Sequence, residues 1–243
     1  MAKYSKMTDG QHEAIVDGLG GEQGVAQFLA GELVVVPKAH QVSAEGLADG
    51  GITYAAPVDV QAFLADQRNF YREVYGKKVP RVNLPSQRPG FSWGLVMAPF
   101  MTPQWLWDCA REREGIGAWK YDAESLDTLI ETNDRNPKDG AYTLWCRNRR
   151  AADEEYKGKS RDFIVSAGIH GMTLAEYENL FIWFHYKTGK FLDPTTWTLC
   201  TGSLCRDGDV PHGSGRGGGL RVSWDGRDNA LPGLRVREVV RSR

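Results

Sequence analysis

Hydrophobic residues recur at helical spacing in three stretches of the middle of the chain. A helix is expected from Asp59, whose carboxylate suits an N-cap, to Gly76. Thr102-Pro103 predicts a second helix, because a capping hydroxyl precedes proline at the first helical position. The sequence Thr173-Leu-Ala-Glu176 is a capping box and predicts an amphipathic helix over 173–188. The middle of the chain therefore supplies helices with well-marked starts.

The N-terminal residues form a separate pattern. Residues 9–31 carry hydrophobic positions typical of two short helices, and a β-rich run over 33–36 stops at Pro37. Residues 38–57 are rich in Gly and Ala and show no period, which is typical of a linker. The chain is therefore divided into a small helical N-terminal module or cap (1–37), a linker (38–57) and an α+β domain (58–243).

Strand-like patterns alternate with these helices. Residues 92–97 predict a buried strand, whereas 126–130 and 141–147 alternate hydrophobic and polar side chains. The turn-rich sequence NDRNPKDG between the last two predicts a β-hairpin. The charged stretch 147–161 carries both signs and predicts a solvated helix or loop.

The pattern changes at residue 197. A strand-like WTLC is followed by 201–219, which is dominated by Gly, Ser, Asp and Arg. In 220–224 the period of two places Leu220, Val222 and Trp224 inward and the two residues between them outward.

The same rule applies to the closing segment. It places Leu234 and Val236 inward and Arg235 and Arg237 outward. A polar loop therefore lies between two strands, an arrangement suited to recognition.

Composition and charge exclude several classes of protein. The chain has 243 residues, 41% hydrophobic, with a net charge of -1. The size and hydrophobicity suit a packed core, and the charge balance gives no bulk attraction to nucleic acid or to an anionic membrane. No apolar run approaches the ~18 residues of a membrane helix, and no secretory signal is visible. The default expectation is a cytoplasmic protein, with non-classical export or display on a virion as alternatives.

Candidate chemistry is sparse. Cys200 and Cys205 are close enough in sequence to form a disulfide in an oxidising compartment, but no second pair with zinc spacing is present, so no metal is expected. The spacing Gly213-x-Gly215-x-x-Gly218 precedes a strand rather than a helix, so it predicts no dinucleotide site and no cofactor. The known hydrolase, metalloprotease and kinase motifs are absent from the sequence, so no catalytic residues are assigned.

Long motifs in the middle and tail carry a family resemblance. They are YREVYGKKV, WDCAREREGIGAWKY, NDRNPKDGAYTLWCRNRRAADEE, AGIHGMTLAEYENLFIWFHYKTGKFLD and WTLCTGSLCRDGDVP. Residues 71–240 resemble a multi-copy family of uncharacterised proteins of uncultured bacterial lineages, and 19–36 resemble an N-terminal module of the same lineages. That family supplies no activity to carry over.

The C-terminal plan is similar to a second group. A strand containing Thr201-Gly-Ser203 and a closing Leu234-Arg-Val-Arg strand resemble the C-type lectin fold of formylglycine-generating-enzyme-like domains and of variable proteins of diversity-generating retroelements. In retroelement targets, mutagenesis at adenines randomises residues near the C-terminus. The oxidising cysteine pair of the sulfatase-activating enzymes has no counterpart here, so that activity is not implied.

The resemblance and the alternating strands together predict a non-enzymatic ligand-binding or display protein with a hypervariable surface over 212–230. The ligand is expected to be a protein or a small molecule, and Arg216, Arg221 and Arg227 would contact its carboxylate or phosphate groups. The expected ligand-binding residues are His212, Ser214, Arg216, Arg221, Ser223, Asp225, Arg227, Asp228 and Asn229.

Two alternatives come from other classes of protein. One is an enzyme of unknown reaction whose cleft lies between the 59–188 body and the tail, which requires a buried carboxylate or histidine with a shifted pKa. The other is a phage or intracellular assembly subunit in which the aromatic helix 173–188 packs against a partner.

Overall fold

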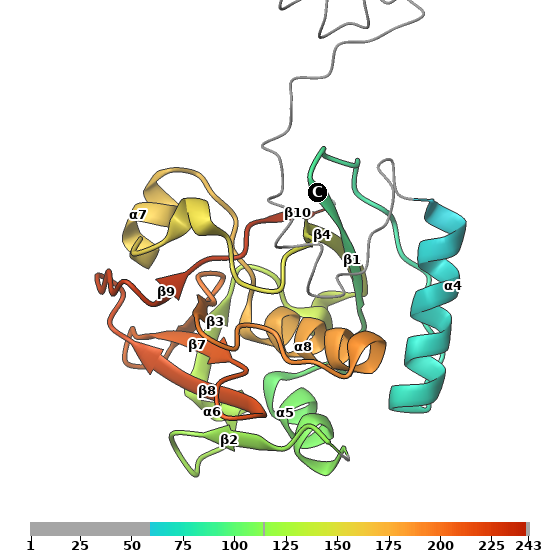
Figure 1. Ribbon diagram of the computed structural model, residues 1–243, viewed down its shortest axis with the longest axis horizontal. Helices are drawn as coiled ribbons and strands as arrows, with labels where there is room; N and C mark the ends of the chain where they lie inside the picture. The colour runs from blue at the N-terminus through green and yellow to red at the C-terminus, as the bar shows by residue number, and fades with distance from the viewer. Residues whose placement is uncertain (1–58, 114, 242–243) are drawn as a thin grey trace, which may run out of the picture. The chain divides into compact units, whose positions relative to one another are not determined.

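The computed structural model describes residues 59–113 and 115–241, and these form a mixed α+β fold in which helices and strands are interspersed up to residue 188 and strands follow (Figure 1). The predicted N-terminal module and linker lie outside the described residues. The helices of the described part are α4 (Val60–Phe70), α5 (Pro103–Glu112), α6 (Leu126–Leu129), α7 (Arg161–Ser166) and α8 (Leu174–Thr188), with a π-helical turn at Tyr71–Tyr75 and 3₁₀ turns at Pro137–Asp139 and Glu154–Tyr156.

Three sheets surround α8 in the described residues. The strands are β1 (Phe91–Met97), β2 (Ala118–Lys120), β3 (Ile130–Asn133), β4 (Tyr142–Arg147), β5 (Trp197–Leu199), β6 (Ser203–Cys205), β7 (Val210–Ser214), β8 (Leu220–Asp225), β9 (Leu234–Arg235) and β10 (Val239–Arg241). Their orders are β1-β4-β10, β2-β8-β7-β5-β9 and β3-β6. In the five-stranded sheet β2 runs parallel to β8 and β5 parallel to β9, and the other neighbours are antiparallel.

The predicted helix starts are confirmed. The Asp59 carboxylate accepts the N–H of Gln61 at 2.8 Å, and the helix it opens runs through the π-helical turn to Gly76. Thr102 caps α5 through its hydroxyl, and Thr173 and Glu176 form the reciprocal pair of bonds of a capping box. Each cap satisfies amide groups that have no partner inside a helix, so a local residue pattern determines where the helix begins.

The predicted hairpin of 126–130 with 141–147 is wrong. Ser125 caps the short helix α6, in which Leu126 and Leu129 share one buried face. The strand β3 that follows pairs with β6, whereas β4 pairs with β1 and β10. The alternation over five residues fits a helical turn as well as a strand, so the pattern alone did not distinguish them.

The helix α8 begins and ends where expected, but it is not amphipathic. All residues of Leu174–Phe184 are buried, including Glu176, Glu178 and Asn179. Arg135 and Tyr142 both contact the Glu176 carboxylate, at 2.7 and 2.8 Å. A helix surrounded by sheets and by other helices buries its polar residues as well, and these then need partners within the chain. The helix surface that the assembly alternative offered to a partner is covered by this chain itself.

The tail strands are distributed over all three sheets. β6 joins β3, β10 joins β4, and β5, β7, β8 and β9 form the five-stranded sheet with β2. The body and the tail therefore share their sheets. The enzyme alternative expected them to face each other across a cleft.

Two side chains of the tail depart from the period-two prediction. Leu234 and Val236 are buried as expected, but Arg237 is also buried, because β9 ends at Arg235 and the chain then leaves the strand. Trp224 was expected in the core, yet it is only partly buried and meets the exposed Tyr121 edge to face at 5.4 Å. Strict alternation does not extend past the end of β9 to Arg237, whereas Trp224 lies inside β8 opposite Pro211, next to the end of the strand, where it packs against Tyr121.

The charged stretch 147–161 is a loop with a 3₁₀ turn, and it is not wholly solvated. Asp153 is buried and pairs with Arg147 at 2.6 Å. Cys200 and Cys205 are buried thiols without a disulfide. In the described part of the chain, no group of His, Cys, Asp and Glu could hold a metal ion, and no helix is long and apolar enough to cross a membrane.

Candidate functional site

The outer face of the five-stranded sheet brings together most of the predicted site residues. An added Cβ at Gly213 would lie 2.0 Å from the Tyr177 ring of α8, so the two pack in direct contact. Gly213 therefore faces α8, and its neighbours His212 and Ser214 face the opposite side of β7. The β7–β8 register places Ser223 opposite His212 and Arg221 opposite Ser214. His212 and Ser214, expected in a loop, lie instead on a buried strand.

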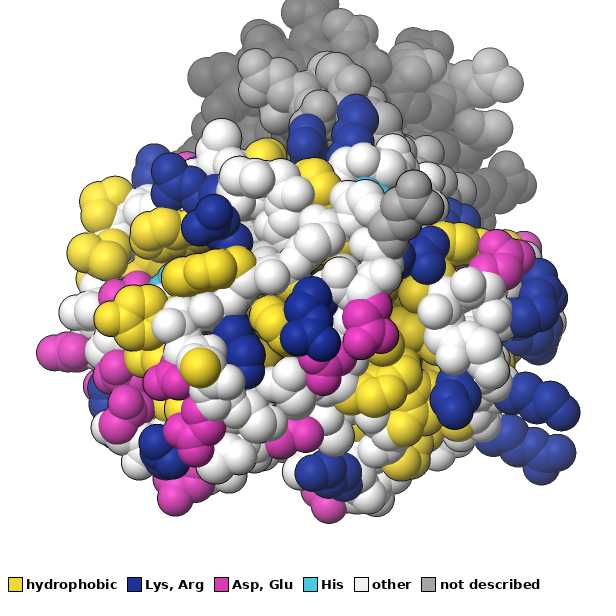
Figure 2. Space-filling view, turned by 90° about the horizontal axis from the view of Figure 1, so that it is seen from below, with side chains coloured by type: hydrophobic (Ala, Val, Ile, Leu, Met, Phe, Trp, Pro, Cys, Tyr) yellow, Lys and Arg dark blue, Asp and Glu magenta, His cyan; other side chains and the backbone are white. Residues whose placement is uncertain are grey.

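This face contains a hollow of about 400 Å³. That volume lies in the size range of small-molecule and side-chain pockets. The side of the molecule on which β2 and β8 lie shows hydrophobic side chains interleaved with Lys and Arg, and also a number of Asp and Glu side chains (Figure 2). The residues that line the hollow are Trp119, Trp197, His212, Ser214, Arg221, Ser223, Trp224, Asp225 and Leu231.

A histidine and a carboxylate meet in the hollow. His212 Nε2 lies 3.2 Å from the Asp225 carboxylate, which also accepts the Asn229 amide at 3.2 Å. Burial lowers the pKa of His212, and the nearby Asp225 opposes that shift only in part. The imidazole is therefore neutral at pH 7, and it stacks on the Trp197 indole with ring centroids 5.2 Å apart. The Asp225 carboxylate therefore accepts the Asn229 amide and lies next to the His212 ring.

Two arginines lie over indole rings. The guanidinium of Arg221 is 5.3 Å from the Trp119 ring, and that of Arg216 is 5.1 Å from the Trp197 ring. Parallel pairing of β2 with β8 puts Trp119 opposite Arg221, which explains the first contact. A guanidinium on an aromatic face keeps the N–H groups at its edge available for an anion.

Four predicted residues do not line the hollow: Arg216, which lies over the Trp197 ring, and the last three, Arg227, Asp228 and Asn229. Arg227 pairs with Asp162 of α7 at 2.8 Å and is therefore already engaged. Asp228 is exposed in the turn after β8 and does not line the hollow. Asn229 reaches it only through its bond to Asp225.

The sequence did not point to Trp119, Trp197 or Leu231 as site residues. Trp119 lies on the three-residue strand β2, and its place in the site depends on parallel pairing with a strand far along the chain. In the structure Trp119 and Leu231 stand out as large hydrophobic residues that stay exposed, at 45% and 44%. Exposure of that kind is visible only in the fold.

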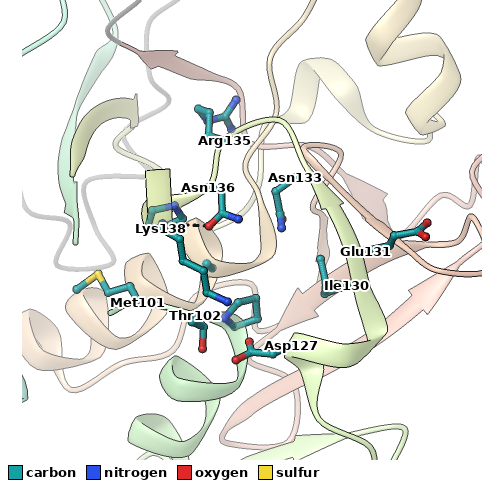
Figure 3. A pocket seen from close by; sticks show the side chains of 12 residues that line it. Met101, Thr102, Asp127, Ile130, Glu131, Asn133, Arg135, Asn136 and Lys138 are labelled. Atoms are coloured by element: carbon teal, nitrogen blue, oxygen red, sulfur yellow. Dashed lines mark hydrogen bonds between the residues drawn. The ribbon is translucent and has the colours of Figure 1, made fainter. Parts of the chain in front are cut away.

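A second cavity, of about 220 Å³, lies between α5, β3 and the turn after it (Figure 3). Asn133 and Lys138 point into it, whereas Glu131 points away. Its other polar groups already serve the fold: the Thr102 hydroxyl caps α5, and the Asp127 carboxylate accepts the N–H of Gln104 at 3.0 Å. No nucleophile paired with a base lines this cavity, so it does not favour the enzyme alternative.

Comparison of the chain with protein-family models, with curated proteins and with solved structures gives no significant match.

Proposed function

We propose that the protein is a non-enzymatic ligand-binding or display protein, and that its ligand binds on the outer face of the five-stranded sheet. The observation that carries the proposal is the hollow in which Arg221, over the Trp119 ring, and the His212–Asp225 pair lie together, with Arg216 over the ring of Trp197, which also lines the hollow. Aromatic walls with a few convergent polar groups are typical of binding sites.

The sheet separates the binding side chains from those that hold the fold. On β8, Leu220 and Val222 are fully buried, whereas Arg221 is exposed and Ser223 is half-buried. Substitution on the outer face therefore removes little buried hydrophobic area. A surface that can change without loss of the core is what a variable display protein requires.

The finer assignment is a C-type-lectin-like variable protein of the kind that diversity-generating retroelements act on. The proposal is supported by the anchoring of Thr201-Gly-Ser203, the segment on which the resemblance rests. The Ser203 hydroxyl accepts the N–H of Leu174, and the Gly202 N–H donates to the Met172 carbonyl at 3.0 Å. A fixed segment of this kind is a suitable support for a neighbouring variable face.

The binding face can be tested by changing four of its side chains together. We expect the variant Arg216→Gln, Arg221→Gln, Ser223→Ala, Asp225→Asn to lose ligand binding while its melting temperature stays within about 3 °C of the parent, since these side chains are exposed or half-buried. The labelled chain is measured on arrays of glycans and of peptides, and each bound probe is remeasured with the variant.

The control for this test is Arg72→Gln with Glu73→Gln, an exposed ion pair on the π-helical turn. It should bind every probe as the parent does. Probes that the four-residue variant still binds, arrays without any bound probe, or a collapse of the variant's melting transition would each contradict the proposal.

Hypervariability is tested at the level of the gene. Sequencing its 3′ end across one source population should show substitutions in codons for outward positions such as 216, 221, 223 and 225, beside a near-copy repeat and a reverse transcriptase. Codons for Gly213, Leu220 and Val222 should stay constant, because these residues face α8 or the core. An invariant tail without a repeat would remove the retroelement assignment and leave a fixed binding surface.

A further inference from the structure

The β7–β8 turn concentrates positive charge at one end of the hollow. Gly217 has φ +77, and an added Cβ there would lie 3.2 Å from Nη2 of Arg221. The Arg221 guanidinium is therefore packed against the turn that also carries Arg216. Glycine is favoured at Gly217 both for its left-handed backbone and for the space that Arg221 occupies.

Neither of these two arginines has a counter-charge in the described part of the chain. The guanidinium groups of Arg216 and Arg221 make no hydrogen bond and no ion pair there, and they lie over the rings of Trp197 and Trp119. Asp225, the acid on the same strand, is four residues away, or roughly 13 Å along an extended chain. Its carboxylate already accepts the Asn229 amide and lies 3.2 Å from His212 Nε2. Two like charges near one turn, without a partner, favour the binding of an anion at this end of the hollow.

The surroundings of the turn indicate which molecule carries that anion. Trp119 and Leu231 line the hollow and are 45% and 44% exposed, and Tyr121, which is 69% exposed, packs against Trp224 of the hollow. These aromatic residues extend beyond the hollow over the edge strand β2. Exposed Trp and Tyr next to Arg is the composition of the residues that dominate protein–protein binding energy.

We propose that Arg216 and Arg221 form a carboxylate-binding subsite for an acidic side chain of a protein partner, with Trp119 and Tyr121 packing against the partner's surface around it. The inference rests on the proposed function and adds the chemistry of the ligand. Each guanidinium can present two parallel N–H groups to a carboxylate, and stacking on an indole reduces the ordering that binding requires.

The test uses the full chain and three labelled probes measured by fluorescence anisotropy. The first is a ten-residue peptide of alternating Glu and Ala, the second is its Gln twin, and the third is a trimer of a hexuronic acid. We expect saturable binding of the Glu peptide and binding of the Gln twin that is weaker by about tenfold or more. The uronate trimer should bind more weakly than the Glu peptide.

Single substitutions then locate the site. Arg216→Gln and Arg221→Gln should each weaken binding of the Glu peptide by about tenfold. Arg227 is a matched exposed arginine that already pairs with Asp162, so Arg227→Gln should leave this binding unchanged. Lys77→Gln with Lys78→Gln controls for the separate basic surface at the end of the π-helical turn. The melting temperatures of all variants should match the parent.

Several outcomes would overturn the subsite. The Gln twin could bind as tightly as the Glu peptide, or no saturable binding of the Glu peptide could be found up to about 1 mM. Arg227→Gln could weaken binding of the Glu peptide as much as Arg216→Gln and Arg221→Gln do, or only the Lys77→Gln, Lys78→Gln variant could weaken it. Preference for the uronate trimer would assign the anion to a carbohydrate. If the four-residue variant loses binding of the array probes but Arg216→Gln does not, the binding face is supported and the carboxylate subsite is contradicted. If the four-residue variant still binds every probe, both proposals are contradicted.

Discussion

Replacing Arg237 by methionine will lower the free energy of unfolding by about 3–5 kcal/mol, because it leaves a buried carboxylate without its cation. The Arg237 side chain is 1% exposed and lies 3.0 Å from the Asp193 carboxylate. It also donates to the Thr198 hydroxyl and to the backbone carbonyls of Arg149 and Arg150, at 3.1, 2.8 and 2.7 Å. The guanidinium thus joins the closing segment to β5 and to the loop after β4.

Urea unfolding of the parent and of the variant measures this loss. Arg241→Met, at an exposed position of β10, is the matched control and should change the stability by less than about 0.5 kcal/mol. The double variant Arg237→Met, Asp193→Asn should be more stable than Arg237→Met alone, because the buried charge is gone and asparagine tolerates the left-handed backbone at this position (φ 45). A loss below about 1 kcal/mol for Arg237→Met would show that the ion pair does not hold the segment.

The Glu178→Met variant will be more stable than the parent, and its advantage will grow as the pH rises. Glu178 is fully buried in α8, and neither of its carboxylate oxygens has a hydrogen-bond partner in the described part of the chain. Burial raises the pKa of Glu178 well above its ordinary value, and Asp127 and Asp108 raise it further against the opposing effect of Lys120. Methionine has a similar length and needs no partner, so we expect a gain of about 1–3 kcal/mol near pH 5.

The pH dependence follows from the direction of that shift. Above the ordinary pKa of about 4.3 the unfolded chain releases the Glu178 proton while the folded chain keeps it, so the parent loses stability as the pH rises. The slope approaches about 1.4 kcal/mol per pH unit until the folded pKa is reached. Methionine at 178 removes this loss, and Glu112→Met on the exposed side of α5 should not. Parallel stability curves for the parent and Glu178→Met between pH 5 and pH 8 would contradict the assignment.

Helix starts were the part of the fold that the sequence predicted best. Asp59, Thr102 and the pair Thr173 and Glu176 each satisfy amide groups within one turn, so the necessary information is local. The hairpin prediction failed where Leu126 and Leu129 fit either a strand or a helical turn. Only the pairing of β3 with β6 distinguishes the two.

About half of the candidate site could be read in the same local way. The period of two correctly placed Arg221 and Ser223 on the face opposite Val222, since alternation is a property of any paired strand. It could not identify Trp119 and Trp197, whose roles come from β2 and β5 lying beside β8 and β7. Nor could it show that Arg227 is engaged by Asp162.

The sequence by itself determined the helix starts of the middle region, the α+β class and the alternation of β8, because caps and strand periods act over a few residues. Only the tertiary structure decided which strands are neighbours, and the neighbouring strands in turn determine which side chains line the hollow. It also decided that Arg237 and Glu178 are buried, because burial depends on segments distant in sequence that pack around them. The sequence around each residue of the proposed binding face therefore predicts which way its side chain points, whereas the tertiary structure determines which of these side chains lie next to one another.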